Sequence, residues 1–106
     1  MDRVTPIRRG ARPSMANFTV RVELHRASVL DYEVLHAAME ERGFSRTIAA
    51  DSNETYKLPT AEYTISGTDR GQVLAQAKRA AGDTGKSFAA LVTESAGRTW
   101  HGLEKG

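Results

Sequence analysis

Histidine and arginine are the residues of this chain whose types could carry out chemistry. His25 ends an alternating segment that also contains Arg21, and Arg26 follows it directly. A histidine can take the 2′-hydroxyl proton of RNA while arginines stabilise the charge on phosphorus, so these residue types suffice for metal-independent RNA cleavage. We therefore treat His25 as a catalytic candidate and Arg21 as an RNA-binding candidate.

His25 and His36 each have an interpretation that involves no catalysis. His25 could be a solvated residue at a strand end, and His36 could be a partly buried packing residue at the border of an apolar helix face. The three histidines lack a ligand spacing such as HxxxH, and the chain has no cysteine, which excludes disulfides, thiolate metal sites and a cysteine nucleophile. We expect no metal and no small-molecule cofactor.

A further candidate is the segment Gly97-Arg98-Thr99-Trp100-His101-Gly102, which places a cation, an aromatic ring and a histidine together. Arg98 could bind an RNA phosphate while Trp100 stacks on a base. The alternative is that Trp100 covers the core of a small domain. The first strand presents Thr, Arg, Glu and His outward rather than stacking aromatics, which disfavours binding in the manner of RNA-recognition domains.

The elements that must position these residues follow from the hydrophobic pattern. Phe18 to His25 alternate with the period of a half-buried strand, Ser28 can cap a helix of about 14 residues, and Gly43 can end it. The pattern then predicts strands over 44–50 and 56–66 joined by a turn at 51–54, with Pro59 at an edge or bulge. A helix from 68 or 69 to about 81, a strand over 87–94 and room for an extra C-terminal strand over 98–103 complete the chain.

This order predicts an α+β fold, a ferredoxin-like βαββαβ sandwich whose antiparallel sheet carries two helices on one face. The other face would be open and would expose Arg21 and His25. Such a face binds nucleic acid, pairs with another subunit or is covered by the C-terminal segment, and we expect a homodimer through the strands or this face. The predicted core consists of Phe18, Val22, Leu35, Met39, Val73, Phe88 and Val92.

Length and charge indicate one domain preceded by a tail. A chain of 106 residues has room for one core. Its net charge is +2, but residues 1–14 hold four arginines and one aspartate, which leaves the rest of the chain at −1. We expect residues 1–15 to be a disordered basic tail and residues 16–106 the ferredoxin-like domain. The tail could be an extension before a second start at Met15, an arm that contacts nucleic acid, or a segment that affects only solubility.

No apolar segment approaches the roughly 20 residues of a membrane span, and no signal core begins the chain. We therefore expect a soluble, cytoplasmic protein with no membrane partner.

Several segments resemble one protein family. They are FTVRVELH at 18–25, Asp31-Tyr32, Leu35-His36 with Met39, GFSRTI at 43–48, YKLPTAEY at 56–63, LVTES at 91–95 and GRTW at 97–100. Over about residues 16 to 104 they resemble the GhoS family, the endoribonuclease antitoxins of type V toxin-antitoxin systems. The resemblance implies a ferredoxin-like fold, similar to the small nuclease subunit of CRISPR adaptation complexes, and sequence-selective cleavage of a toxin's messenger RNA.

Two functions therefore remain open. In the first, the protein binds RNA and cleaves it without a metal, using Arg21, His25, His36 or Arg46. The resemblance is what implies His36 as a catalytic candidate and Arg46 as an RNA-binding candidate. In the second, it is a non-catalytic dimeric module that binds a protein or nucleic-acid partner without turnover.

Overall fold

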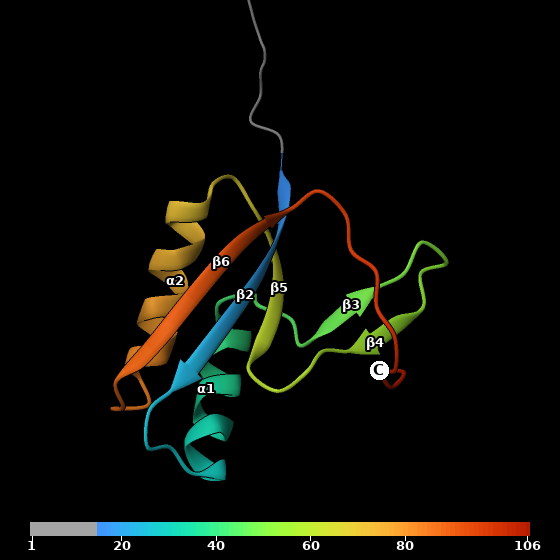
Figure 1. Ribbon diagram of the computed structural model, residues 1–106. Helices are drawn as coiled ribbons and strands as arrows, with labels where there is room; N and C mark the ends of the chain where they lie inside the picture. The colour runs from blue at the N-terminus through green and yellow to red at the C-terminus, as the bar shows by residue number, and fades with distance from the viewer. Residues whose placement is uncertain (1–14) are drawn as a thin grey trace, which may run out of the picture.

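The computed structural model describes residues 15–106, and the predicted tail, apart from Met15, lies outside the described residues. The elements are β2 (Ala16–Leu24), α1 (Val29–Glu41), β3 (Thr47–Ala49), β4 (Thr55–Lys57), β5 (Glu62–Gly67), α2 (Arg70–Gly82) and β6 (Phe88–Ser95), as Figure 1 shows. The α+β class agrees with the sequence prediction, and so do an antiparallel sheet and two helices. Neither helix of the described part has the length and apolar character that crossing a membrane requires.

The main sheet has three antiparallel strands in the order β5-β2-β6. The register places Arg21 of β2 between Glu62 of β5 and Leu91 of β6. Because side chains alternate along a strand, Arg21 points to the face opposite to its buried neighbours Val20 and Val22. This is the open face that the alternation predicted.

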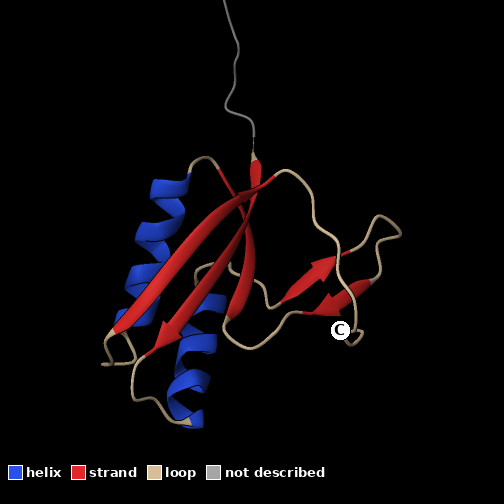
Figure 2. Cartoon of the chain, in the orientation of Figure 1, coloured by secondary structure: helices blue, strands red, loops and turns tan. Residues whose placement is uncertain are grey.

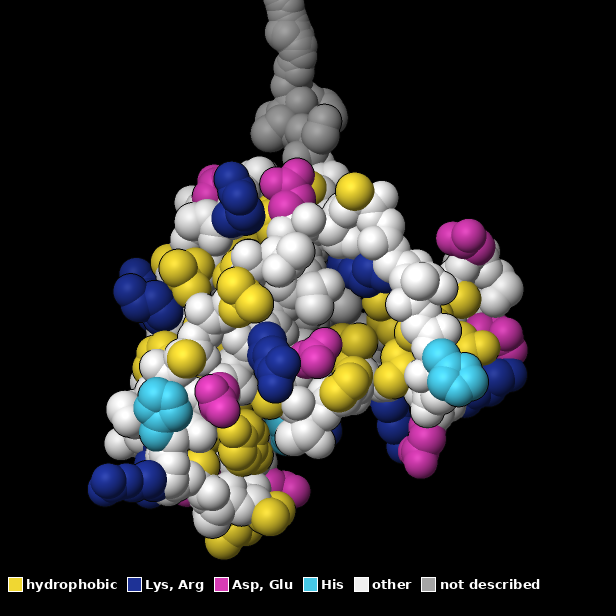
Figure 3. All heavy atoms as spheres, viewed as in Figure 1, with side chains coloured by type: hydrophobic (Ala, Val, Ile, Leu, Met, Phe, Trp, Pro, Cys, Tyr) yellow, Lys and Arg dark blue, Asp and Glu magenta, His cyan; other side chains and the backbone are white. Residues whose placement is uncertain are grey.

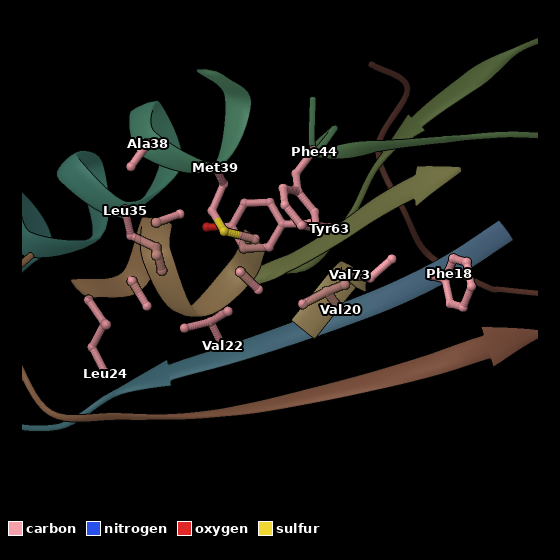
Figure 4. Packing of buried hydrophobic residues seen from close by; sticks show 13 residues of the cluster. Phe18, Val20, Val22, Leu24, Leu35, Ala38, Met39, Phe44, Tyr63 and Val73 are labelled. Carbon is pink, nitrogen blue, oxygen red and sulfur yellow. The ribbon is translucent and has the colours of Figure 1, made fainter. Parts of the chain in front are cut away.

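Both helices pack against the other face of the sheet, and the core lies between the helices and the sheet (Figure 2). Figure 4 shows Leu35 and Met39 of α1 directed at the side chains of β2 and at Tyr63 of β5. Of the seven predicted core residues, five are buried and the two from β6, Phe88 and Val92, are partly buried against the same cluster. The predicted core is therefore confirmed, with β6 at its margin.

Local signals in the sequence account for the helix ends. The Ser28 hydroxyl accepts a hydrogen bond from the Asp31 amide, and the Asp31 carboxylate accepts one from the Ser28 amide. These two backbone amides at the start of α1 are thereby satisfied. Asp69 caps α2 in the same way through the amide of Gln72. Gly43, directly after the C-cap of α1, has a φ of 90°, which a residue without Cβ adopts at little cost.

The predicted hairpin differs from the observed one. The strand expected over 56–66 is broken into β4 and β5, and β3 pairs with β4 in a separate two-stranded sheet. Pro59 cannot donate to a ladder, and Ala61 has a φ of 73°, so the chain turns between the two strands. One bridge, between Ser45 and Thr64, joins this hairpin to the main sheet.

The prediction of an extra strand over 98–103 is wrong. After β6 the chain crosses to the hairpin and ends beside β4, as Figure 1 shows. The Lys57 amide donates to the Glu104 carbonyl over 2.7 Å, and the Gly106 amide donates to the Thr55 carbonyl over 2.9 Å. Residues 104–106 therefore pair with β4 through their backbone, and residues 98–103 form a loop between the two sheets.

Candidate nucleic-acid interface

The C-terminal loop forms a groove with the open face of the main sheet and the hairpin. Its volume is about 580 Å³. Figure 3 shows hydrophobic and cationic side chains gathered in the region between the sheet and the hairpin. We call it the Trp100 groove, and it is lined by Thr19, Ile48, Leu58, Pro59, Glu62, residues 97–101 and Leu103.

Trp100 is half-buried and packs on the hairpin, not in the main core. Its ring lies 5.5 Å from the ring of Tyr56 in β4, centroid to centroid, at an interplanar angle of 58°. Such a tilted pair fixes the indole while leaving part of it exposed to the groove. Of the two interpretations that the sequence left open, covering the main core does not apply, because Trp100 is not among the residues of the core cluster. A partly exposed ring remains available for stacking.

Arg98 lies at the junction of two hollows. It is exposed and lines both the Trp100 groove and a second hollow of about 380 Å³ on the other side of the loop, which also includes Asn17 and Asp51. Within residues 15–106, no carboxylate forms an ion pair with it. A guanidinium in this position can reach a phosphate while an adjoining base contacts Trp100.

Arg21 and His25 lie on the open face, as predicted, but neither lines the Trp100 groove. Glu62 faces Arg21 across the strand pair, and Glu23 follows two residues later on the same face, so carboxylates flank this cation. The Nδ1 atom of exposed His25 lies 3.2 Å from the Ser87 hydroxyl. Arg21 and His25 therefore lie in a nearly charge-balanced environment.

His36 occupies the opposite side of the sheet, with Arg46. Its Nδ1 lies 2.7 Å from the hydroxyl of Tyr63, a residue with no exposed surface. Burial raises the pKa of the Tyr63 hydroxyl far above its ordinary value, so the hydroxyl stays protonated and donates to His36. Burial, assisted by the Arg46 guanidinium, lowers the pKa of His36. The neutral ring therefore accepts at Nδ1 and carries its proton on Nε2.

The structure does not bring the two catalytic candidates together. The sheet separates His25 and Arg21 on the open side from His36 and Arg46 on the helix side. His36 also has its acceptor nitrogen engaged, which matches the packing role that the sequence left open. No group of three or more metal-ligating side chains occurs among residues 15–106.

Two residues of these arrangements were not singled out from the sequence. Tyr63 lies in the strand predicted over 56–66, but its hydrogen bond to His36 spans 27 positions and has no local signature. Tyr56 contacts Trp100 because the C-terminal loop returns to β4, and the sequence did not predict this return. Aromatic residues at inward or hairpin positions are the only signal that could have drawn attention to them.

Comparisons of the chain with protein-family models, curated protein sequences and solved structures found no match in any of the three.

Proposed function

We propose that this is a small RNA-binding protein of the kind represented by the antitoxin endoribonucleases it resembles, and that single-stranded RNA binds in the Trp100 groove. The observation that carries the proposal is that Arg98 and Trp100 line one solvent-open groove, with His101 beside them. Proteins that hold single strands combine cations for the backbone with aromatic rings on which bases stack. The groove offers both within three successive residues.

The charge of the domain favours contact within the groove over long-range attraction. Residues 15–106 carry a net charge of −1, so the domain as a whole does not attract a polyanion. Binding then depends on Arg98 and on base stacking, with four further arginines available in residues 1–14. Affinity should fall with salt in proportion to the phosphates neutralised.

The same proposal includes a ferredoxin-like sandwich as the scaffold. The order β6-β2-β5 sets the fourth strand of the βαββαβ unit beside the first, and the first beside the third. The Ser45–Thr64 bridge lies where the second strand would join, and both helices lie on one face. These features support a ferredoxin-like arrangement in which most of the second strand has turned away with the hairpin.

Cleavage of a toxin's messenger RNA is the part of the proposal that rests on the resemblance. On the open side, His101 beside Arg98 and His25 near Arg21 each combine a histidine with a cation that RNA could reach. His36 would need to lose the hydrogen bond from Tyr63 before Nδ1 could accept a proton.

A non-catalytic dimeric module is the second candidate. It is favoured by the separation of His25 from His36 and by the engagement of the acceptor nitrogen of His36. In this case the protein would hold RNA without turning it over.

Binding can be tested by fluorescence anisotropy with a labelled AU-rich single-stranded RNA and purified protein in the presence of chelator. Stacking on one base contributes about 1–3 kcal/mol, so Trp100→Ala should weaken binding about 5- to 150-fold. Arg98→Ala should weaken binding and reduce its salt dependence. Arg79→Ala, which removes an exposed arginine from α2, is the matched control and should bind normally. Unchanged affinity in both groove variants, with unchanged melting temperatures, would refute the proposed site.

Cleavage is tested by following the same RNA on denaturing gels. Products that disappear in His25→Ala or His101→Ala would support the enzyme and assign its histidine. Intact RNA bound by every variant except the groove variants would support the non-catalytic module.

A further inference from the structure

Strand β6 is a long sheet edge without a partner in residues 15–106. It lies at the outer side of the β5-β2-β6 sheet, spans Phe88–Ser95 and contains no proline and no lysine. The opposite edge, at β5, is bridged by Ser45 of the hairpin segment. Proteins usually protect exposed edges with charge, proline or bulges, because an open row of amides and carbonyls recruits another strand.

The hydrogen bonds to β2 determine which groups of β6 face outward. One step beyond the pair formed by Leu24 and Phe88, the His25 amide donates to the Ser87 carbonyl over 2.9 Å. Hydrogen-bonded pairs alternate with non-bonded pairs in an antiparallel ladder. Odd-numbered residues of β6 therefore direct their amides and carbonyls toward β2, and even-numbered residues, with Ala90 at the middle, direct theirs to the free edge.

The sequence of β6 is complementary to itself about Ala90. A two-fold axis at this residue sets Ala90 opposite its own copy and Phe88 opposite Val92 of the second chain. These are the residues whose backbone groups face outward, so each facing pair can exchange two main-chain hydrogen bonds. A two-fold axis at Leu91 would instead place opposite each other the backbone amides and carbonyls that are already hydrogen-bonded to β2.

The side chains agree with the same register. On the open face, Leu91, which is 63% exposed, would lie opposite Ala89 of the second chain. Continued two residues beyond the start of β6, the same register sets Lys86 opposite Glu94 at each end, placing opposite charges together twice. Within residues 15–106 the Lys86 ammonium makes a long contact of 3.7 Å with the Asp31 carboxylate, and its side chain remains 37% exposed.

We propose that β6 pairs antiparallel with β6 of a second copy of this chain, about a two-fold axis at Ala90, to give a continuous six-stranded sheet. The proposal does not depend on RNA binding, because the Trp100 groove lies on the hairpin side of the sheet. An interface made of one strand pair is small, so the dimer should form in a concentration-dependent manner.

Amide hydrogen exchange by NMR gives the sharpest test of the register. At high protein concentration the amides of Phe88, Ala90 and Val92 should be protected, and on dilution their exchange should accelerate. The amides of Ala89 and Leu91, bonded to β2, should stay protected at both concentrations. Fast exchange of the even-numbered amides at every concentration would refute the pairing.

Reversing charges at Lys86 and Glu94 gives a second test, whose result does not depend on a single variant. Glu94→Lys should shift sedimentation equilibrium toward the mass of one chain, and so should Lys86→Glu. Mixing the two variants should restore the dimer, because each then offers the charges that the other lacks. Glu41→Lys, the same charge change at the end of α1, is the control and should dimerise like the parent protein.

Ala90→Pro removes the central outward donor without removing a hydrogen bond to β2, and should abolish the dimer. Circular dichroism must show that the fold is retained. A parent protein that is monomeric at all concentrations, or a dimer that persists in both Glu94→Lys and Ala90→Pro, would overturn the proposal.

Discussion

The Nδ1 atom of His36 lies 2.7 Å from the Tyr63 hydroxyl, a hydrogen bond that ties α1 to β5 inside the helix-covered side of the sheet. The Tyr63 ring also contacts Phe44 edge-on, with centroids 6.4 Å apart. A buried hydroxyl needs an acceptor, and His36 supplies it. The pair therefore links the helix, the edge strand and the start of the hairpin segment.

We predict that Tyr63→Phe lowers the free energy of unfolding by about 1–3 kcal/mol, because Nδ1 of His36 is then half-buried without a donor. Urea unfolding followed by circular dichroism measures the change. The ring and its packing are kept, so a larger loss would indicate rearrangement of the core and not the loss of one hydrogen bond.

We predict that His36 makes the protein less stable at acidic pH. Burial lowers its pKa from the ordinary value of 6.5 in the folded state. Just below pH 6.5 the unfolded chain therefore binds more protons than the folded one, and the free energy of unfolding falls as the pH decreases through this window. Melting temperatures at pH 7.5 and 5 should differ less in His36→Gln than in the parent protein. His25→Gln, at an exposed position, should keep the parent difference.

Periodic patterns predicted the part of the fold that local chemistry controls. The alternation from Phe18 to Leu24 assigned the buried face of β2, and Ser28 and Gly43 located the ends of α1. The break at Pro59 was expected only as an edge or bulge, because one residue does not reveal that the strand stops and the hairpin leaves the sheet. Periodicity also did not predict that Leu30 of α1 would be 74% exposed.

The candidate site was less predictable than the core. Arg98 and Trp100 could be chosen from their residue types, but the groove that contains them exists only because the C-terminal loop returns to β4. That return is made by backbone hydrogen bonds between residues about 50 positions apart, which leave no pattern in the sequence. The same holds for the sheet that separates His25 from His36.

We predict that Leu35→Ala costs about 2–5 kcal/mol, because the side chain is fully buried between α1 and the sheet. Phe88→Ala should cost less than the 3–5 kcal/mol typical of a fully buried phenylalanine, since Phe88 is only partly buried. Arg21→Ala should change the free energy of unfolding by no more than about 0.5 kcal/mol. Chemical denaturation of the three variants checks the order, and unfolding by Arg21→Ala would contradict the assigned face.

We predict that Ala61→Gly stabilises the protein by up to about 1 kcal/mol. Ala61 has a φ of 73°, where a Cβ costs about 1–2 kcal/mol, and the entropy lost by glycine offsets only part of this. Thermal unfolding should show a melting temperature raised by several degrees. Ala49→Gly, at an exposed position in β3, should instead destabilise, since strand backbone gains nothing from glycine.

We predict that residues 1–14 add to RNA affinity through charge. The segment contains four arginines, and counterion release from single strands changes the logarithmic salt slope by about 0.7 for each phosphate neutralised. A chain that begins at Met15 should therefore bind RNA more weakly at low salt, with a slope reduced by up to about 3. Replacing the four arginines by glutamine in the full chain keeps its length and should give the same change. Equal slopes in all three proteins would mean that the phosphate contacts lie within residues 15–106, and the slope would then have to fall in Arg98→Ala.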